Sequence, residues 1–235
     1  MNSTKLIIFD QPKQQEFAMT TVTTTQKVKR ALIVIDVQNE YFTGNMLIEY
    51  PDPQLSLRNI GRAMDAAKEA GIPVLVVQHS APENSPIFAR GSQSWQLHEV
   101  VASRHADHRI EKNMASVFTG TDAAAWLQKN EITTISVVGY MTHNCNASTI
   151  YEAAHNGYAV EVLSDASGAL PYANAAGFAS AEEIHRIYSV VFHSNFAAVT
   201  STDEWISAAQ AAIPTAIAKS NVLESHLAGR QRQAA

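Results

Sequence analysis

Cysteine is almost absent from this sequence, because Cys145 is the only one in 235 residues. A single cysteine cannot form a disulfide within the chain, so the usual reason to expect a secreted, disulfide-stabilised fold is missing. No apolar run approaches the length of a transmembrane helix, and the N-terminus lacks the long apolar stretch of a signal peptide. We therefore expect a soluble, cytoplasmic protein.

A strong excess of one charge is missing too. The chain has 17 Lys and Arg residues against 22 Asp and Glu residues, a net charge of −5, and the cations form no stripe. Nucleic acids and anionic membranes attract clustered cations, so neither is an expected partner. No Gly-x-Gly-x-x-Gly or Gly-x-x-x-x-Gly-Lys motif follows a predicted strand, which disfavours a nucleotide-binding module.

Apolar residues, at 46% of the chain, are numerous enough to fill the core of one large domain. Short apolar runs typical of buried strands alternate with segments of helical periodicity. The predicted strands are 31–37, 73–79, 109–112, 133–138, 158–163 and 196–199. One predicted helix follows Pro51 and ends at Gly71, and another is opened by a capping box at Ser180. The other predicted helices are 95–102, 122–129, 147–156 and 203–213. This alternation predicts an α/β fold with three α-β-α layers and a central, mainly parallel sheet.

The same pattern predicts one domain over residues 31–213. Residues 1–30 form a predicted N-terminal extension, with an apolar run at 5–9 and a threonine-rich run at 20–25. This extension is either an arm that lies on a partner subunit or a disordered leader. Residues 214–235 have no strong pattern and are expected to form a C-terminal tail.

Chemically capable residues fall where predicted strands end, at Asp36, His79, Lys112 and Cys145. Ligands of open α/β sheets bind at the carboxyl ends of the strands, so these side chains can share one rim. A lone cysteine is more often a small buried hydrophobic residue than a nucleophile. Cys145, however, sits where a strand leads into a helix, and a helix N-terminus favours a thiolate. Asp36 needs a partner or a catalytic duty, because a buried, unpaired carboxylate is costly.

The order of acid, amine and thiol resembles that of the isochorismatase-like cysteine hydrolases, in their amidohydrolase branch, over roughly residues 31–205. The resemblance depends on Ile-Asp-Val-Gln-Asn at 35–39 with Phe42, on Glu-Lys at 111–112, and on Gly-Tyr-Met-Thr-His-Asn-Cys at 139–145. It implies that Cys145 is the nucleophile, that Asp36 transfers the proton and that Lys112 is the electropositive third member. It also implies a cis peptide between Tyr140 and Met141, and an oxyanion hole formed by the backbone N–H groups of Met141 and Cys145.

The reaction that this resemblance implies is hydrolysis of a C–N bond in a small amide or ureide through a thioester. We expect the ammonium of Lys112 and the helix N-terminus to supply thiolate at neutral pH, and Asp36 to accept the thiol proton. Similar proteins that hydrolyse a vinyl ether lack the cysteine, so Cys145 favours amide chemistry. The alternatives are an isochorismatase-type hydrolase for a non-amide substrate, a non-catalytic α/β protein that binds a small molecule, and a hydrolase-like scaffold in which Asp36 and Lys112 form only an ion pair.

Substrate contacts and partners are predicted more coarsely. The loop 80–94 and nearby aromatic residues are expected to set specificity. The candidate substrate-binding residues are Phe42, Gln78, Trp95, Phe118, Tyr140, His143 and Tyr172. Nicotinamidase-like members carry an Asp-x-His metal pair after the second strand, whereas this chain has only His79, which we expect to be hydrogen-bonded. We therefore predict no metal and no cofactor. Because family members are commonly dimers or tetramers, we expect a homo-oligomer.

Overall fold

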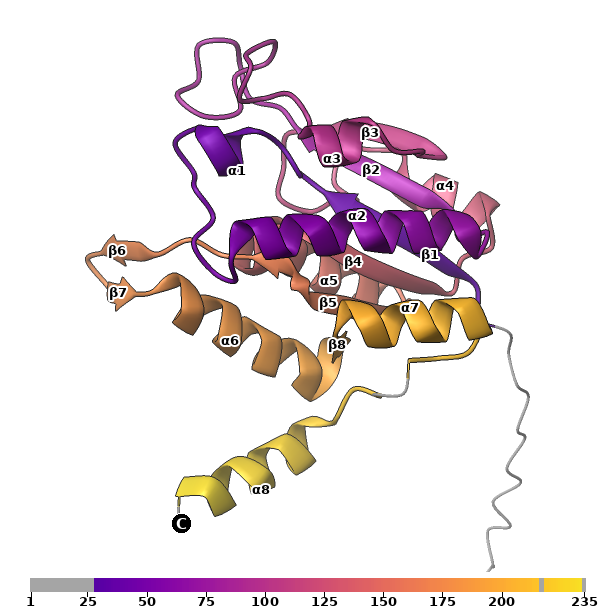
Figure 1. The fold of residues 1–235 in the computed structure, drawn as a ribbon. Coiled ribbons are helices and arrows are strands. Elements are labelled where there is room, and N and C mark those ends of the chain that lie inside the picture. Colours follow the sequence, from indigo (N-terminus) through magenta and orange to yellow (C-terminus); the bar gives the residue numbers. More distant parts are fainter. Residues whose placement is uncertain (1–27, 216–217, 234–235) are drawn as a thin grey trace, which may run out of the picture.

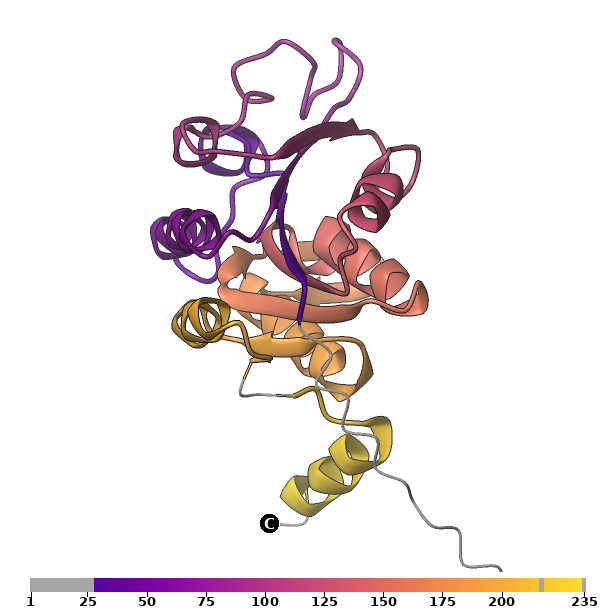
Figure 2. The ribbon, with the colours of Figure 1, turned by 90° about the vertical axis from the view of Figure 1, so that its right-hand side faces the viewer.

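A six-stranded parallel sheet forms the centre of the computed structural model, which describes residues 28–215 and 218–233 (Figure 1). Its strand order is β3-β2-β1-β4-β5-β8, and every neighbouring pair is parallel. The strands are β1 (Arg30–Ile35), β2 (Val74–His79), β3 (His108–Lys112), β4 (Thr134–Tyr140), β5 (Ala159–Gly168) and β8 (Ala198–Thr200). Helices cover both faces of the sheet (Figure 2), which confirms the predicted three-layer α/β fold.

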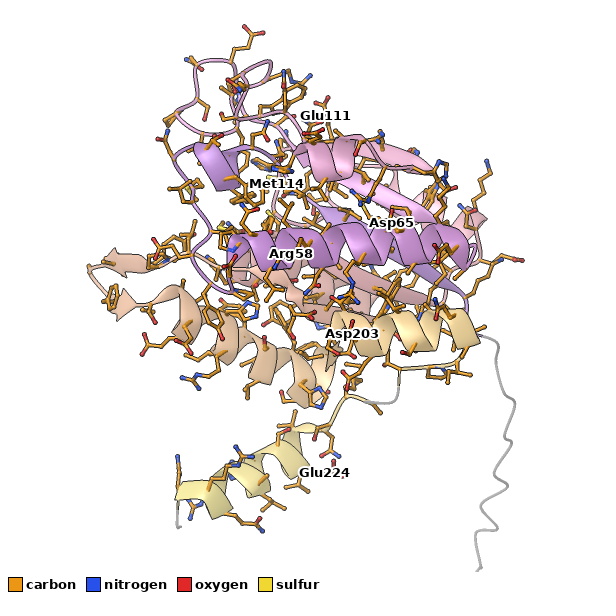
Figure 3. All side chains as sticks on the ribbon, viewed as in Figure 1. Arg58, Asp65, Glu111, Met114, Asp203 and Glu224 are labelled. Atoms are coloured by element: carbon orange, nitrogen blue, oxygen red, sulfur yellow. The ribbon has the colours of Figure 1, made fainter. Side chains whose placement is uncertain are left out.

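Alternate residues of β1 belong to two different core clusters, because successive strand side chains point to opposite faces. Leu32 and Val34 pack with α2 (Pro53–Glu69) and α7 (Thr202–Ala211). Ile33 and Ile35 pack on the other face with α4 (Ala123–Lys129) and α5 (Ala147–His155). Arg62 of α2 forms an ion pair with Asp203 of α7, and Figure 3 labels Asp203.

Several short elements were not predicted. They are α1 (Glu40–Thr43), the antiparallel hairpin β6 (Tyr172–Asn174) and β7 (Gly177–Ala179), the π-helical turns η1 (Thr142–Asn146) and η2 (Phe192–Phe196), and α8 (Val222–Gln233). α6 (Ala181–Val191) begins at the predicted capping box of Ser180 and Glu183. None of the residues of α8 is buried. A helix that packs against no core has no apolar face by which the sequence could predict it.

The predicted helix at 95–102 is wrong in its first half, because only α3 (Glu99–Ala102) is helical. The carbonyl oxygen of Trp95 accepts hydrogen bonds from the side-chain amides of Gln38 and Gln78, at 2.6 and 2.8 Å. In a longer helix, this carbonyl oxygen would instead accept a hydrogen bond from a backbone N–H group of the next turn.

The predicted N-terminal extension and C-terminal tail lie partly outside the described residues. Of the predicted N-terminal extension, residues 1–27 lie outside them. The domain over 31–213 and the tail over 214–235 stay predictions. Within the described part of the chain, no helix is both long enough and apolar enough to cross a membrane.

The order in which strands are added to the sheet reverses between β1 and β4. From β1 the chain moves to β2 and β3 on one side, then crosses back to β4 on the other side of β1. Such a switch point opens a crevice at the carboxyl ends of the two strands, where α/β proteins bind ligands. Asp36 directly follows β1, and the turn that holds Cys145 follows β4.

Gly139 is required where β4 passes β1 at this switch point. Its φ is +104°, and a Cβ there would lie 2.1 Å from the carbonyl oxygen of Ile35. We expect Gly139→Ala to lower the free energy of unfolding by about 3 kcal/mol or more, because backbone strain and overpacking add. Gly157→Ala is the matched control, since Gly157 has a φ of +86° and a Cβ added to it would meet no atom within 4 Å.

Urea denaturation of both variants measures the difference. For Gly157→Ala we expect a loss of only about 1 to 2 kcal/mol, the cost of a positive φ alone. Equal losses in the two variants would show that the contact with Ile35 adds nothing.

Candidate active site

Three strand ends bring Asp36, Lys112 and Cys145 into contact. The Nζ atom of Lys112 lies 2.6 Å from Oδ2 of Asp36 and donates a hydrogen bond to Sγ of Cys145 at 3.2 Å. The same ammonium donates to the carbonyl oxygen of Met114 at 3.1 Å. The side chains of Asp36 and Lys112 have no exposed surface, and Cys145 is 6% exposed. The predicted acid, amine and thiol therefore form one buried cluster.

Asp36 leaves β1 in a left-handed conformation, with φ of +52°, which aspartate tolerates better than most residues. Its backbone N–H still pairs with the carbonyl of Val77 in β2. No described residue gives either carboxylate oxygen a well-directed hydrogen bond. The ion pair with Lys112 is thus the main compensation for burying this charge, and it leaves the carboxylate free to accept a proton from a neighbour.

The turn that carries Cys145 is held by hydrogen bonds at both of its ends. Asn146 donates from Nδ2 to the carbonyl of Gly139 at 2.8 Å, and the Thr149 hydroxyl donates to the carbonyl of Cys145 at 2.7 Å. The peptide bond between Tyr140 and Met141 is cis. These contacts place the thiol in the first turn of a continuous helical segment formed by η1 and α5.

The charge state of the thiol differs from the expectation. Burial and, to a smaller extent, the Asp36 carboxylate raise the pKa of Cys145 to about 12, and Lys112 offsets this rise only in part. The site therefore holds a neutral thiol at rest, and not the preformed thiolate that its place near a helix N-terminus suggested. Burial alone would lower the pKa of Lys112, but Asp36 and Cys145 outweigh burial and raise it, so this side chain remains an ammonium ion.

His79 ends β2 beside the cluster and makes a hydrogen bond, as expected of a lone histidine. Its Nδ1 lies 3.3 Å from Nζ of Lys112. Burial lowers the pKa of His79, and the charge of Lys112 lowers it further, so the ring is neutral and accepts the hydrogen bond at Nδ1. Its ring packs edge-on against Phe88, with centroids 5.2 Å apart.

A cavity of about 160 Å³ opens onto the thiol, and we call it the cysteine cavity. Its wall consists of Tyr41, Met46, His79, Ile87, Phe88, Ala115, Met141, Asn144 and Cys145. Ile87 and Phe88 come from the loop 80–94, which supports the expectation that this loop shapes the site. The buried Glu40 ties that loop to α1, because its carboxylate accepts from the backbone N–H groups of Phe88 at 3.3 Å and Asn45 at 2.6 Å.

None of the predicted substrate-binding side chains forms the wall of the cysteine cavity. Gln78 and Trp95 serve the loop, since Gln78 binds the Trp95 carbonyl and the Trp95 indole N–H donates to Ser80 at 2.8 Å. Phe118 stacks on Tyr158, with centroids 6.2 Å apart. Their predicted contacts with substrate stay predictions.

The other candidates surround the turn of Cys145. Tyr140 is fully buried, packs against Phe42 at 5.7 Å and shares a 2.8 Å hydrogen bond with the Ser56 hydroxyl. His143 packs against Tyr172, with ring centroids 5.0 Å apart, and neither of its ring nitrogens has a partner among the described residues. Burial lowers the pKa of His143 to about 4, so this ring is neutral.

Sequence reasoning missed most of the cavity wall. Tyr41 and Phe42 are adjacent, and an aromatic pair in a short segment does not reveal which ring faces the site. Tyr41 faces the cavity and is 2% exposed, whereas Phe42 packs on His98 at 4.7 Å. The positive φ of Phe88, +51°, also has no signal in the sequence.

A larger hollow of about 480 Å³ lies at the other end of the sheet, where β4 and β5 begin. Thr134, Ala159 and Lys219 are among its lining residues, and its buried acid, Glu161, is paired with Arg30 at 2.8 Å. This hollow contains none of the cluster around Cys145. We therefore assign the candidate active site to the cysteine cavity, although it is smaller.

Known proteins resemble this chain in sequence and structure. The isochorismatase domain family matches residues 30–204. The crystal structure of a candidate isochorismatase from Burkholderia xenovorans LB400 is 59% identical, with a TM-score of 0.87, and the match covers 89% of this chain and 100% of the other. A cysteine hydrolase from Pseudomonas syringae pv. phaseolicola 1448A is 27% identical, with a TM-score of 0.73 and coverage of 78% and 93%.

Among curated relatives, the ureidoacrylate amidohydrolase of Methylobacterium radiotolerans is 28% identical over 169 residues, which are 58% of this chain and 66% of the relative. The predicted family resemblance is thereby confirmed. Because the family match spans most of the chain and includes Asp36, Lys112 and Cys145, the protein belongs to the isochorismatase family of hydrolases.

Proposed function

We propose that this protein is a cysteine hydrolase that cleaves a C–N bond of a small amide or ureide through a thioester. The observation that carries the proposal is the buried ammonium of Lys112, which contacts both the Asp36 carboxylate and the Cys145 thiol at the end of a small cavity. A base, a nucleophile and a cation in contact are the parts that acyl transfer by a thiol requires. The similarity to a cysteine hydrolase and to an amidohydrolase supports the same chemistry.

Attack begins with proton transfer, because the resting thiol is neutral. The Asp36 carboxylate accepts the proton of Cys145 as Sγ forms a bond to the substrate carbonyl carbon. Lys112, 3.2 Å from Sγ, stabilises the negative charge that develops on sulfur during this step. Formation of thiolate only during attack accounts for a nucleophile whose pKa at rest is about 12.

The carbonyl oxygen becomes an oxyanion when sulfur adds. In the proposed mechanism the backbone N–H groups of Met141 and Cys145 bind it. The N–H of Met141 donates no hydrogen bond within the described part of the chain, so it is available for this role. Asp36 then returns its proton to the leaving nitrogen, and ammonia or an amine departs. Asp36 then takes a proton from the water molecule that attacks the thioester. The C–S bond breaks, the carboxylic acid product departs, and Asp36 gives its proton to the leaving sulfur, which restores the carboxylate and the thiol.

Ammonia release from a panel of small primary amides and ureides tests the proposed function. We expect turnover of at least one member and none in the Cys145→Ala protein. Turnover of a vinyl ether with no amide turnover would favour the isochorismatase-type alternative. Tight binding of panel members without any turnover would favour a non-catalytic binding protein.

We also propose that the protein is a homo-oligomer that associates through the β6–β7 hairpin and α6. Phe178, Ile187 and Val190 are 72%, 48% and 62% exposed in this region. An isolated two-stranded hairpin is marginally stable in water, and a cluster of exposed apolar side chains is typical of an interface.

Val190→Asp is expected to lower the mass in solution toward that of one chain, since a carboxylate in an apolar interface loses its hydration. Light scattering coupled to size exclusion measures this mass. Arg58→Asp on the exposed side of α2 is the control, and Arg58 is labelled in Figure 3. A native protein that is already a single chain would contradict the proposal.

A further inference from the structure

We propose that the cysteine cavity selects uncharged amides or ureides whose apolar part is no larger than about a benzene ring. The inference rests on the proposed function and adds the substrate class. Three properties of the cavity carry it, namely the charge of its wall, its volume and its polar groups.

The wall of the cysteine cavity carries no charged side chain. None of its nine residues is Asp, Glu, Lys or Arg, and His79 is neutral because burial lowers its pKa. The charges behind the wall, on Asp36 and Lys112, are 2.6 Å apart and have no exposed surface. A carboxylate or ammonium group of a substrate would therefore lose its hydration without gaining an unpaired counterion.

Arg90 is the cation that belongs to the same loop as Ile87 and Phe88, and it does not serve the cavity. It lines a separate surface depression with Ser80, Glu83 and Asn113. Its guanidinium lies 2.6 Å from the carboxylate of Glu111, and its side chain is 57% exposed. A substrate carboxylate within the cysteine cavity would have to compete with Glu111 for this cation.

The size limit follows from the volume and from Phe88. A dry apolar cavity of about 150 Å³ is known to hold benzene, so about 160 Å³ fits a ring or a short branched chain. Phe88 is 4% exposed and packs against the rings of Tyr41 and His79, at 5.3 and 5.2 Å. Glu40 holds its backbone, so the ring is a fixed boundary of the cavity.

Uncharged polar groups on the wall match an amide. No described residue hydrogen-bonds the hydroxyl of Tyr41, and burial raises its pKa well above the usual value, so it remains a protonated donor. The side-chain amide of Asn144, also on the wall, has no partner among the described residues. A donor and an amide can bind the carbonyl and the N–H groups of a neutral substrate without leaving a charge unpaired.

Butyramide and succinamate test the selection, because they have similar chain lengths and differ by a carboxylate. We expect kcat/KM for butyramide to exceed that for succinamate by about a hundredfold or more, the effect of burying an unpaired charge. An Ile87→Arg variant should raise the relative kcat/KM for succinamate at least about tenfold by supplying a counterion. Ile87→Met is the matched control for shape without charge. Equal or better turnover of succinamate by the native protein would overturn the inference and leave the proposed function intact.

Binding to a Cys145→Ser protein gives a second test that needs no turnover. NMR titration should show tighter binding of butyramide than of succinamate, and Phe88→Ala in that background should admit 2-naphthamide, which the parent excludes. Preference for succinamate, or binding of neither amide, would overturn the inference. Binding of butyramide without ammonia release by the native protein would contradict the proposed function alone.

Discussion

Replacement of Cys145 by alanine is expected to reduce ammonia release by about four orders of magnitude or more for every amide that the native protein hydrolyses. The thioester route requires sulfur as the attacking atom, and the chain has no other cysteine to replace it. Asp36 and Lys112 would remain paired at 2.6 Å, so the fold should be kept. Steady-state ammonia assays of matched native and variant protein measure the effect.

A suitable control changes the same helical segment without touching the thiol. Ser148, in the first turn of α5, is half-buried and its hydroxyl makes no hydrogen bond with the described residues, so Ser148→Ala should keep nearly full activity. Denaturation curves should show that Cys145→Ala is folded. Substantial turnover in a folded Cys145→Ala protein would eliminate nucleophilic catalysis by this residue.

Replacement of Asp36 by asparagine is expected to change activity and thiol chemistry in opposite directions. Ammonia release should fall by about a thousandfold, because no group remains to take the thiol proton and return it to the leaving nitrogen. The pKa of Cys145 should nevertheless decrease from about 12, because the Asp36 carboxylate raises it and Lys112 lowers it. Each unit of decrease gives about ten times more thiolate at pH 8.

The ultraviolet absorbance of the thiolate against pH measures this pKa, and the rate of iodoacetamide alkylation follows it. Asp203→Asn is the matched control, because it removes a surface carboxylate that pairs with Arg62 and should leave the thiol unchanged. Asp36→Asn also leaves the buried ammonium of Lys112 unpaired, at a cost of about 3 to 5 kcal/mol, so stability must be measured alongside. A thiol pKa that rises, or activity that persists, would show that Asp36 is not the base.

These two results together separate the proposed triad from a scaffold that merely contains an ion pair. If Asp36 and Lys112 only stabilised the fold, the Asp36→Asn protein would lose stability but retain any ammonia release that it has. Faster alkylation of Cys145 follows from the loss of the Asp36 charge in either case. Lost turnover in a folded Asp36→Asn protein, although its thiol ionises more easily, is the result that assigns Asp36 to the chemistry.

The fold class and the meeting of Asp36, Lys112 and Cys145 can be predicted from the sequence alone. Apolar runs that alternate with helical segments predict parallel strands, and right-handed crossovers place their carboxyl ends along one edge. The structure has β3, β2, β1 and β4 side by side in that edge. Residues at the ends of these strands thus come together although more than a hundred positions separate Asp36 from Cys145.

The choice of aromatic rings that face the thiol depends on tertiary packing. Tyr41 and Phe42 are equivalent in the sequence, yet Tyr41 forms the cavity wall and Phe42 packs outside it. The path of the loop after β2 depends on the amides of Gln38 and Gln78, which hold the Trp95 carbonyl. These contacts join segments far apart in the chain, and local periodicity carries no information about them.

The protonation state of Cys145 was decided in the same way. Position near a helix N-terminus and beside a lysine favours a low pKa, and the sequence predicts both features. Burial and the carboxylate of Asp36 oppose them and prevail, which raises the pKa to about 12. Desolvation is the sum of contacts from every element packed around the sulfur, so its size follows from the assembled core and from no single stretch of sequence.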